Sequence, residues 1–116
     1  MKTACTLSTH VLDTTSGRPA AGIPVSLDRL GEAGPVSICC HSTDADGRVR
    51  AFGTEGARFD SGTYRLRFDT AEHFRSQGTT GFYPYVEIVF FMEDTGGHYH
   101  VPLLLSPYGY TTYRGS

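Results

Sequence analysis

The stretch "GTYRLRFD", residues 62–69, decides the fold of this chain, because its apolar and polar residues alternate without a break. Tyr64, Leu66 and Phe68 fall on one parity, and a threonine and two arginines fall on the other. Successive side chains of a β-strand point to opposite faces of a sheet. The alternation therefore predicts a strand with one buried face.

The same period of two recurs on both sides of this stretch. "IPVSLDRL", residues 23–30, repeats it through Ile23, Val25 and Leu27. "PYVEIVFFME", residues 84–93, is apolar on both faces, as a central strand or a strand at an interface would be. Seven or eight such short strands at regular spacing favour an all-β sandwich or barrel.

Turn and helix signals separate the strands. "DADG" (44–47) and "DTGG" (94–97) supply residues that tolerate a positive φ. "DTAEHFRSQG" (69–78) breaks the period of two, with an Asx/Thr start, a glutamate three residues after Asp69 and a closing glycine. These are helix start and stop signals, so we expect one short helix at about residues 71–77.

Length and composition fit a single domain spanning residues 1–116. The net charge of −2 argues against a nucleic-acid partner, which selects a basic face. No apolar run approaches the roughly 20 residues that span a bilayer, so no membrane contact is expected. The opening "MKTACTLSTHVLD" (1–13) reaches a histidine and an aspartate before an apolar signal region can form. We expect a cytoplasmic protein, or a periplasmic one if a leader has been removed.

Three cysteines, Cys5, Cys39 and Cys40, form a poor disulfide framework, because the count is odd and two are adjacent. The sequence contains no CxxC spacing, which would have suggested a zinc site. We expect three reduced thiols that fill small apolar sites.

Histidines are the first candidates for chemistry. His98 and His100 are two residues apart, so on a strand they share a face, with Val101 on the opposite, core-facing parity. A third, His10, lies in "LSTHVLD" (7–13), but nothing in the sequence places it near the pair. Three readings stay open. The three histidines are polar residues on a solvated face, or imidazole ligands of a metal, or bases that take a proton from water at a pKa near ~6.5.

An arginine beside such histidines would suit a carbonyl, a carboxylate or a planar urea-like group, because the guanidinium donates in a planar fork. The candidates are Arg48, directly after "DADG", and Arg114 near the end; either could equally be a solvated surface residue. "PYGYTTYRGS" (107–116) alternates and predicts a last strand. Its tyrosines, threonines and arginine are typical of surfaces that meet a partner, although simple strand pairing would also explain it.

Four segments together resemble a known family. "HYHVPLLLSPYGYTTYRGS" (98–116) resembles the closing motif of the 5-hydroxyisourate hydrolases, the transthyretin-related enzymes of urate breakdown. "LSTHVLDTTSGRPAAGIPVSL" (7–27), "TDADGR" (43–48) and "FYPYVEIVFF" (82–91) are similar to its opening, the segment after its third strand and its sixth strand. The resemblance covers essentially the whole chain, and the final "YRGS" separates the hydrolases from transthyretin itself.

The resemblance implies an all-β, transthyretin-like β-sandwich of two four-stranded antiparallel sheets, with one short helix after the fifth strand. It implies a homotetramer, a dimer of dimers, whose active sites lie in a channel where dimers meet. The implied reaction is hydrolysis of 5-hydroxyisourate to 2-oxo-4-hydroxy-4-carboxy-5-ureidoimidazoline, with a small-molecule substrate, no cofactor and no metal. The alternative is a transthyretin-like carrier of an aromatic ligand in the same channel.

The resemblance also implies the site residues. The catalytic ones are His10, Arg48, His100 and Ser116, and the substrate-binding ones are Tyr113, Arg114 and Gly115. Which histidine is the base, and what His98 does, stay open at this point.

Overall fold

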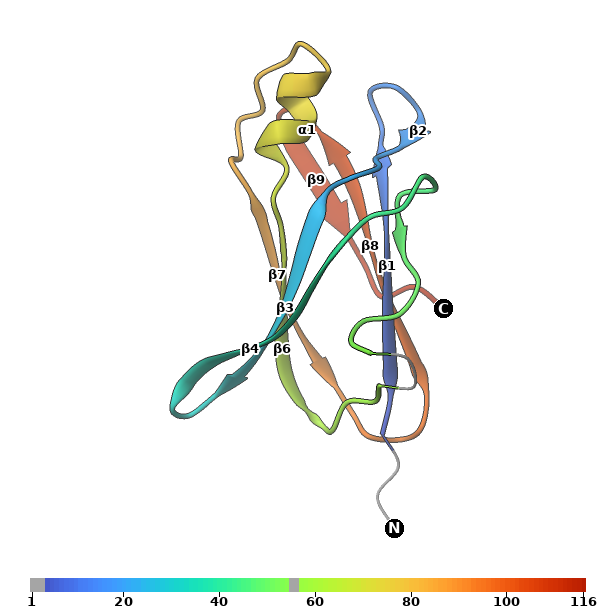
Figure 1. Cartoon of the computed structure of the whole chain (residues 1–116), viewed down its shortest axis with the longest axis vertical. Helices are drawn as coiled ribbons and strands as arrows, with labels where there is room; N and C mark the ends of the chain where they lie inside the picture. Colours follow the sequence, from blue (N-terminus) through green and yellow to red (C-terminus); the bar gives the residue numbers. More distant parts are fainter. Residues whose placement is uncertain (1–3, 55–56) are drawn as a thin grey trace.

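Two β-sheets face each other in the computed structural model, which describes residues 4–54 and 57–116 (Figure 1). The first sheet has the order β4-β3-β6-β7, and every neighbouring pair is antiparallel. Its strands are β3 (Pro24–Gly31), β4 (Gly34–Ser42), β6 (Gly62–Phe68) and β7 (Val86–Met92).

The second sheet has the order β2-β1-β8-β9, with β5 also paired to β1. Its strands are β1 (Thr6–Asp13), β2 (Arg18–Pro19), β5 (Arg48–Val49), β8 (His98–Ser106) and β9 (Gly109–Thr112). The predicted transthyretin-like sandwich is confirmed, but this sheet has five strands rather than four. Its central pair, β1 and β8, is parallel, with a register from Thr6 opposite His98 to Asp13 opposite Leu105. A residue period of two is the same in both strand directions, so the alternation could not reveal this.

The core lies between the sheets and is built from the inward parities of the strands. Tyr64, Leu66 and Phe68 are at most 1% exposed, which confirms the strand predicted from "GTYRLRFD". Val25 and Leu27 of β3 are fully buried beside them, as predicted. Apolar burial of this kind contributes about 25 cal/mol per Å² and is the main term that stabilises the sandwich.

β7 is an edge strand, so the expectation of a central strand is wrong, whereas the interface alternative stays open. Val86 and Met92 point into the core, but Val89 and Phe91 are 58% and 56% exposed on the other face. A strand that is apolar on both faces yet lies at an edge leaves one apolar face uncovered within the chain.

The helix α1 spans Ala71–Ser76, close to the predicted range, with Thr70 as its N-cap residue. No side chain caps it, so the Asx-based start signal does not form its hydrogen bond. α1 follows the sixth strand rather than the fifth, because the two-residue β2 adds one strand.

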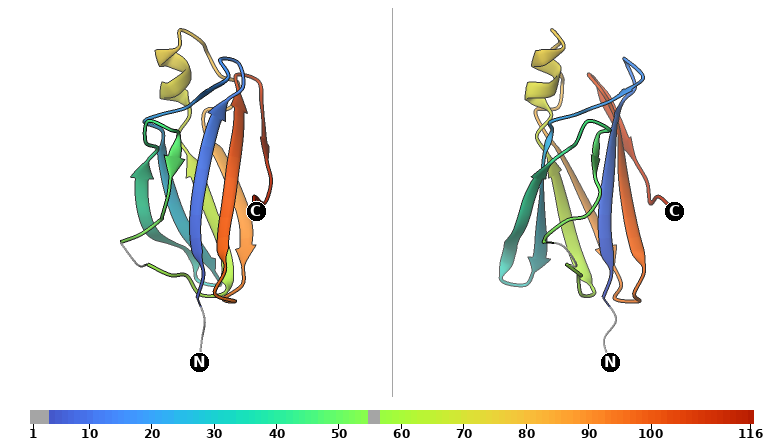
Figure 2. Two further views of the ribbon diagram at one scale, coloured as in Figure 1. Left: turned by 90° about the vertical axis from the view of Figure 1, so that its right-hand side faces the viewer. Right: turned by 45° about the vertical axis from the view of Figure 1, so that its right-hand side comes forward.

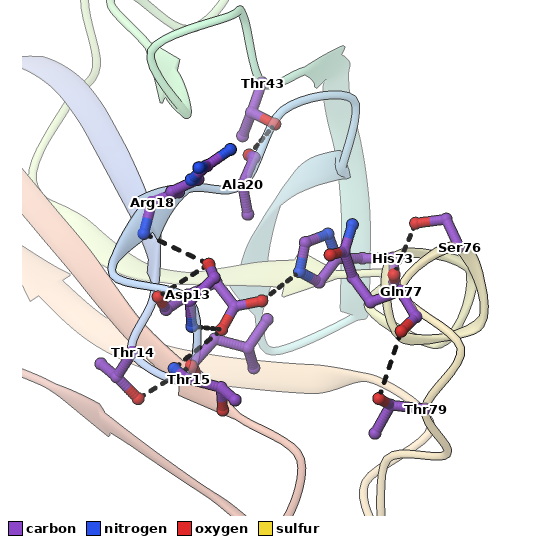
Figure 3. A network of polar contacts seen from close by, with 12 residues as sticks. Asp13, Thr14, Thr15, Arg18, Ala20, Thr43, His73, Ser76, Gln77 and Thr79 are labelled. Atoms are coloured by element: carbon purple, nitrogen blue, oxygen red, sulfur yellow. Dashed lines mark hydrogen bonds and ion pairs between the residues drawn. The ribbon is translucent and has the colours of Figure 1, made fainter.

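A buried hydrogen bond between a histidine and a carboxylate ties α1 to the end of β1 (Figure 3). Nε2 of His73 lies 2.8 Å from Oδ2 of Asp13, and both side chains are under a tenth exposed. Oδ1 of the same carboxylate accepts the backbone N–H of Thr15 at 2.9 Å and of Ser16 at 3.3 Å. The pair therefore fixes the helix over one end of the sandwich.

All three cysteines are free thiols, as expected. Cys5 is buried and Cys39 is half-buried, but Cys40 is exposed, so the expectation of an apolar site is wrong for it. Adjacent residues of a strand face opposite ways, and only Cys39 can face inward. Among the described residues, no helix is long and apolar enough to cross a membrane.

Candidate active site

One face of the β1–β8 pair gathers the histidines. The two strands run side by side (Figure 2, left, blue and orange-red). His100 pairs with Ser8, and the next outward residue of β1 is His10, opposite Pro102. Tyr99 and the other residues of the opposite parity are buried, as predicted. The parallel register therefore places His10 on the face that carries His98 and His100, which no sequence pattern could establish.

Arg48 is brought to the same face by β5, which pairs with β1 so that Arg48 lies opposite His10. The turn before it is locked by Asp44, whose Oδ1 accepts the backbone N–H of Arg48 at 3.0 Å. Gly47 has φ +75° and lies so close to β1 that a Cβ would come within 2.5 Å of the Val11 carbonyl oxygen. Only glycine fits there, and the turn delivers the guanidinium beside the histidines.

Hydrogen bonds link the two histidines of β8 through hydroxyls of β1. Oγ1 of Thr6 lies 2.6 Å from Nδ1 of His98, and Oγ of Ser8 lies 2.7 Å from its Nε2. The same Ser8 oxygen lies 2.8 Å from Nδ1 of His100. Both rings are thereby oriented, and within residues 4–54 and 57–116 Nε2 of His100 is left without a hydrogen bond.

The electrostatics of this face favour a neutral His100. Partial burial lowers its pKa below the ordinary 6.5, and the positive Arg48 and the rings of His10 and His98 lower it further, against a hydrogen bond to the backbone of Ser8. A neutral imidazole with an unbonded nitrogen can accept a proton at neutral pH. His100 thus has both the geometry and the charge state of a general base.

The C-terminal tail also contacts His100. The N–H of Gly115 donates to the carbonyl oxygen of His100 at 2.7 Å. A Cβ on Gly115 would lie 2.6 Å from Cδ2 of His100, so the ring packs directly on the glycine. Ser116 follows and is exposed. The predicted pairing of the tail with a neighbouring strand is confirmed, because β9 pairs with β8. One further bridge pairs Gly115 with His100.

Tyr113 and Arg114 lie elsewhere within this chain. The Arg114 guanidinium carbon sits 4.5 Å from the centre of the Tyr99 ring, in a groove of about 320 Å³ that also involves β7. Since Gly115 takes the parity of His100, its neighbour Arg114 takes the opposite one. That Tyr113 and Arg114 bind the substrate of the histidine face stays a prediction.

Ser8 and Thr6 are the site residues that sequence reasoning missed. A signal existed, because both share the parity of His10 in "TLSTHVLD" and so must face the same way. The metal alternative gains no support from the described residues, which contain no group of three His, Cys, Asp or Glu arranged to hold a metal ion. Hydroxyls occupy both ring nitrogens of His98.

Comparison with known proteins gives a consistent result. A family model described as "HIUase/Transthyretin family" matches residues 7–115. The 5-hydroxyisourate hydrolase 2 of Rhizobium meliloti is 50% identical over 115 residues, which cover 95% of this chain and 95% of the relative.

Solved structures agree. That of Klebsiella pneumoniae 5-hydroxyisourate hydrolase has a TM-score of 0.83 and 38% identity, covering 97% of this chain and 99% of the other. Transthyretin from Sparus aurata has a TM-score of 0.85 and 33% identity, covering 94% of this chain and 95% of the other. With a family model across nearly its whole length and relatives of this similarity, the chain belongs to the HIUase/Transthyretin family.

Proposed function

We propose that this protein hydrolyses 5-hydroxyisourate to 2-oxo-4-hydroxy-4-carboxy-5-ureidoimidazoline, a step of urate degradation. The observation that carries the proposal is the convergence of His10, Arg48 and His100, from three strands, on one face of a sheet. Relatives that are half identical over nearly the full length and are named 5-hydroxyisourate hydrolase support it.

In the proposed reaction, Nε2 of His100 takes a proton from a water molecule. The water oxygen bonds to the lactam carbonyl carbon, and Arg48 stabilises the negative oxygen that develops there. The carbon–nitrogen bond of the six-membered ring then breaks, and the leaving nitrogen gains a proton through His10 or His100. The carboxylic acid so formed ionises at neutral pH, so each turnover releases one proton.

The tail completes the proposed site. Gly115 holds the ring of His100, and the terminal carboxylate of Ser116 orients a histidine or an arginine. Tyr113 and Arg114 close over the substrate, which requires a neighbouring subunit because one chain places them in another groove.

Assembly into a homotetramer is part of the proposal. The exposed Val89 and Phe91 on the edge strand β7 support it, since a partner would cover an apolar face that the chain leaves open. Light scattering of the purified protein measures the mass directly. We further propose a cytoplasmic location, which cell fractionation tests.

A transthyretin-like carrier is the rival function, and the chemistry of the face does not favour it. A carrier of an aromatic ligand needs apolar walls, whereas this face presents imidazoles, a guanidinium and hydroxyls. Fold similarity to transthyretin cannot decide between the two, because one fold supports unrelated functions.

The deciding experiment generates 5-hydroxyisourate in situ with urate oxidase and follows the decay of its absorbance with and without the protein. We expect faster decay with wild type, no acceleration with His100→Ala or Arg48→Ala, and no effect of a metal chelator. Arg50→Ala is the matched control, because Arg50 lies two residues from Arg48 but pairs with Asp44 and Asp46 at the surface. Decay that wild type leaves unchanged would refute the proposal, and loss on chelation would indicate a metalloenzyme.

A further inference from the structure

The proposed reaction does not use the two hydrogen bonds that Ser8 makes with the histidine rings of this face. Ser8 is only 8% exposed, yet its hydroxyl lies between Nε2 of His98 and Nδ1 of His100, at 2.7 and 2.8 Å. His98 in turn reaches Thr6, and it is exposed whereas His100 is half-buried. The result is a continuous line of hydrogen bonds from the proposed base to an exposed ring.

The chemistry of one hydroxyl couples the two rings. Serine donates one hydrogen and accepts up to two. If both facing nitrogens were bare, Ser8 could satisfy only one, so at least one of them carries a proton. When His100 carries it on Nδ1, Nε2 is bare and basic, and Ser8 donates to His98. When His98 carries it on Nε2, Ser8 donates to His100, whose own proton then sits on Nε2.

We propose that Ser8 and His98 form a proton relay that moves the charge gained by His100 away from Arg48 and out to the exposed His98. The relay rests on the proposed hydrolysis, and its two members act through His100 rather than on the substrate, so they are positioning residues.

The proton movements balance as follows. Nε2 of His100 takes a proton from water, and the ring becomes positively charged with a proton on each nitrogen. The Nδ1 proton passes to Oγ of Ser8 while the Ser8 hydroxyl proton passes to Nε2 of His98. His100 is then neutral with its proton on Nε2, and His98 holds the positive charge while the water oxygen bonds to the carbonyl carbon. When Nε2 gives its proton to the leaving nitrogen, Ser8 returns a proton to Nδ1 of His100 and His98 returns one to Ser8. All three groups thereby regain their starting state, and the proton of the new carboxylic acid goes to solvent.

Charge placement gives the relay its direction. The groups that face His100 are Arg48 from β5, His10 and Ser8 from β1 and His98 from β8. From the tail, Gly115 packs on the ring, and the terminal carboxylate of Ser116 follows it. A positive His100 is disfavoured by partial burial and by the permanent charge of Arg48, whereas His98 is exposed and water can solvate its charge. Moving the charge from one ring to the other therefore removes a repulsion during turnover.

The relay is tested with variants that cut it at two places and with a proton acceptor that replaces it. Ser8→Ala removes the bridging hydroxyl, His98→Ala removes the exposed acceptor, and Ser8→Thr restores a hydroxyl. Thr14→Val is the matched control. Thr14 directly follows β1, and its Oγ1 donates to the carbonyl oxygen of Leu105 in β8 at 3.2 Å. Like Ser8, it therefore links the two strands through a hydroxyl, but it lies outside the relay. Circular dichroism and light scattering confirm that each variant keeps its fold and mass.

In weakly buffered solution we expect Ser8→Ala and His98→Ala each to lower kcat roughly 10- to 100-fold. This loss is a part of the rate acceleration that general acid–base catalysis supplies. Added imidazole should restore their kcat in proportion to its concentration, because it takes the charge from His100 in place of His98. Ser8→Thr should recover the kcat that Ser8→Ala loses, Thr14→Val should keep the wild-type kcat, and neither should respond to imidazole. A ring that is only misplaced would not regain its rate with a dissolved acceptor.

A second measurement does not depend on activity. Ring ¹⁵N spectra report which nitrogen of each ring carries a proton, and those of His98 and His100 should both change in Ser8→Ala, because Ser8 is hydrogen-bonded to both rings. Full speed in Ser8→Ala, a slow Ser8→Ala that imidazole leaves slow, or ring spectra that Ser8→Ala leaves unchanged would each overturn the relay. Wild type without hydrolase activity would instead refute the proposed function, and the relay's part in turnover with it.

Discussion

Gly115→Ala is the substitution whose effect the structure specifies most closely. A Cβ at this position would lie 2.6 Å from Cδ2 of His100 and 3.2 Å from its Cβ and Cγ. Ordinary contact begins at 3.4 Å, so the ring has to move by 3.4 − 2.6, or about 0.8 Å, or the tail has to detach. If the ring moves, Nδ1 of His100 leaves the 2.8 Å contact with Ser8 that fixes the ring. If the tail detaches instead, His100 loses the packing of Gly115 and the hydrogen bond from its N–H.

The magnitude follows from the tolerance of catalytic geometry. A displacement of about 1 Å costs on the order of 100-fold in rate, or about 2.7 kcal/mol of transition-state free energy. We therefore expect kcat of Gly115→Ala to fall roughly 100-fold in the 5-hydroxyisourate decay assay. The fall should appear mainly in kcat, because the base is displaced, and the His100 ring shifts in ¹⁵N spectra should change without substrate.

Gly109→Ala is the matched control, since a Cβ there meets only Oγ of Ser106 at 3.8 Å. It lies in the same tail, in β9, and should keep the wild-type kcat. A Gly115→Ala variant with wild-type kcat and unchanged His100 shifts would show that the glycine does not position the ring. A rise in KM with kcat unchanged would assign Gly115 to substrate binding instead.

Two further predictions concern ionisation. Burial opposes ionisation of Asp13, but hydrogen bonds from His73, Ser16 and Thr15 outweigh it and lower its pKa below 3.8. The stability it contributes is complete above 3.8 and is lost as pH falls through the lowered value. Asp13→Ala should therefore reduce the free energy of unfolding by about 2 kcal/mol at pH 7 in urea titrations, and by less in strong acid; equal stability at pH 7 would contradict a stabilising role for these hydrogen bonds. For His100, whose pKa is lowered, the neutral base persists as pH falls through 6.5, so the acid limb of kcat/KM should lie below 6.5; a limb above that value would exclude it as the base.

How far the sequence reached is clearest in β6 and β7. For β6, a strict period of two was enough to predict the strand and its buried face. Tyr64, Leu66 and Phe68 are two residues apart, and every second side chain of a strand points to the same face. For β7 the pattern was ambiguous, because an edge strand that meets a partner and a central strand bury both faces alike. The helix position was also readable, although its cap was not, since capping depends on the rotamer of one side chain.

The candidate site divides in the same way. Local order alone determined that His98 and His100 share a face and that a glycine-containing turn precedes Arg48, because side-chain parity and turn geometry involve neighbours in the chain. Only the tertiary structure decided that β1 and β8 are parallel, which places Ser8 beside His100 and His10 on the same face. Strand direction and register between residues some 90 positions apart are set by packing of the whole sandwich. The chemistry depends on those long-range pairings, and so the sequence supplied the groups while the fold decided which of them meet.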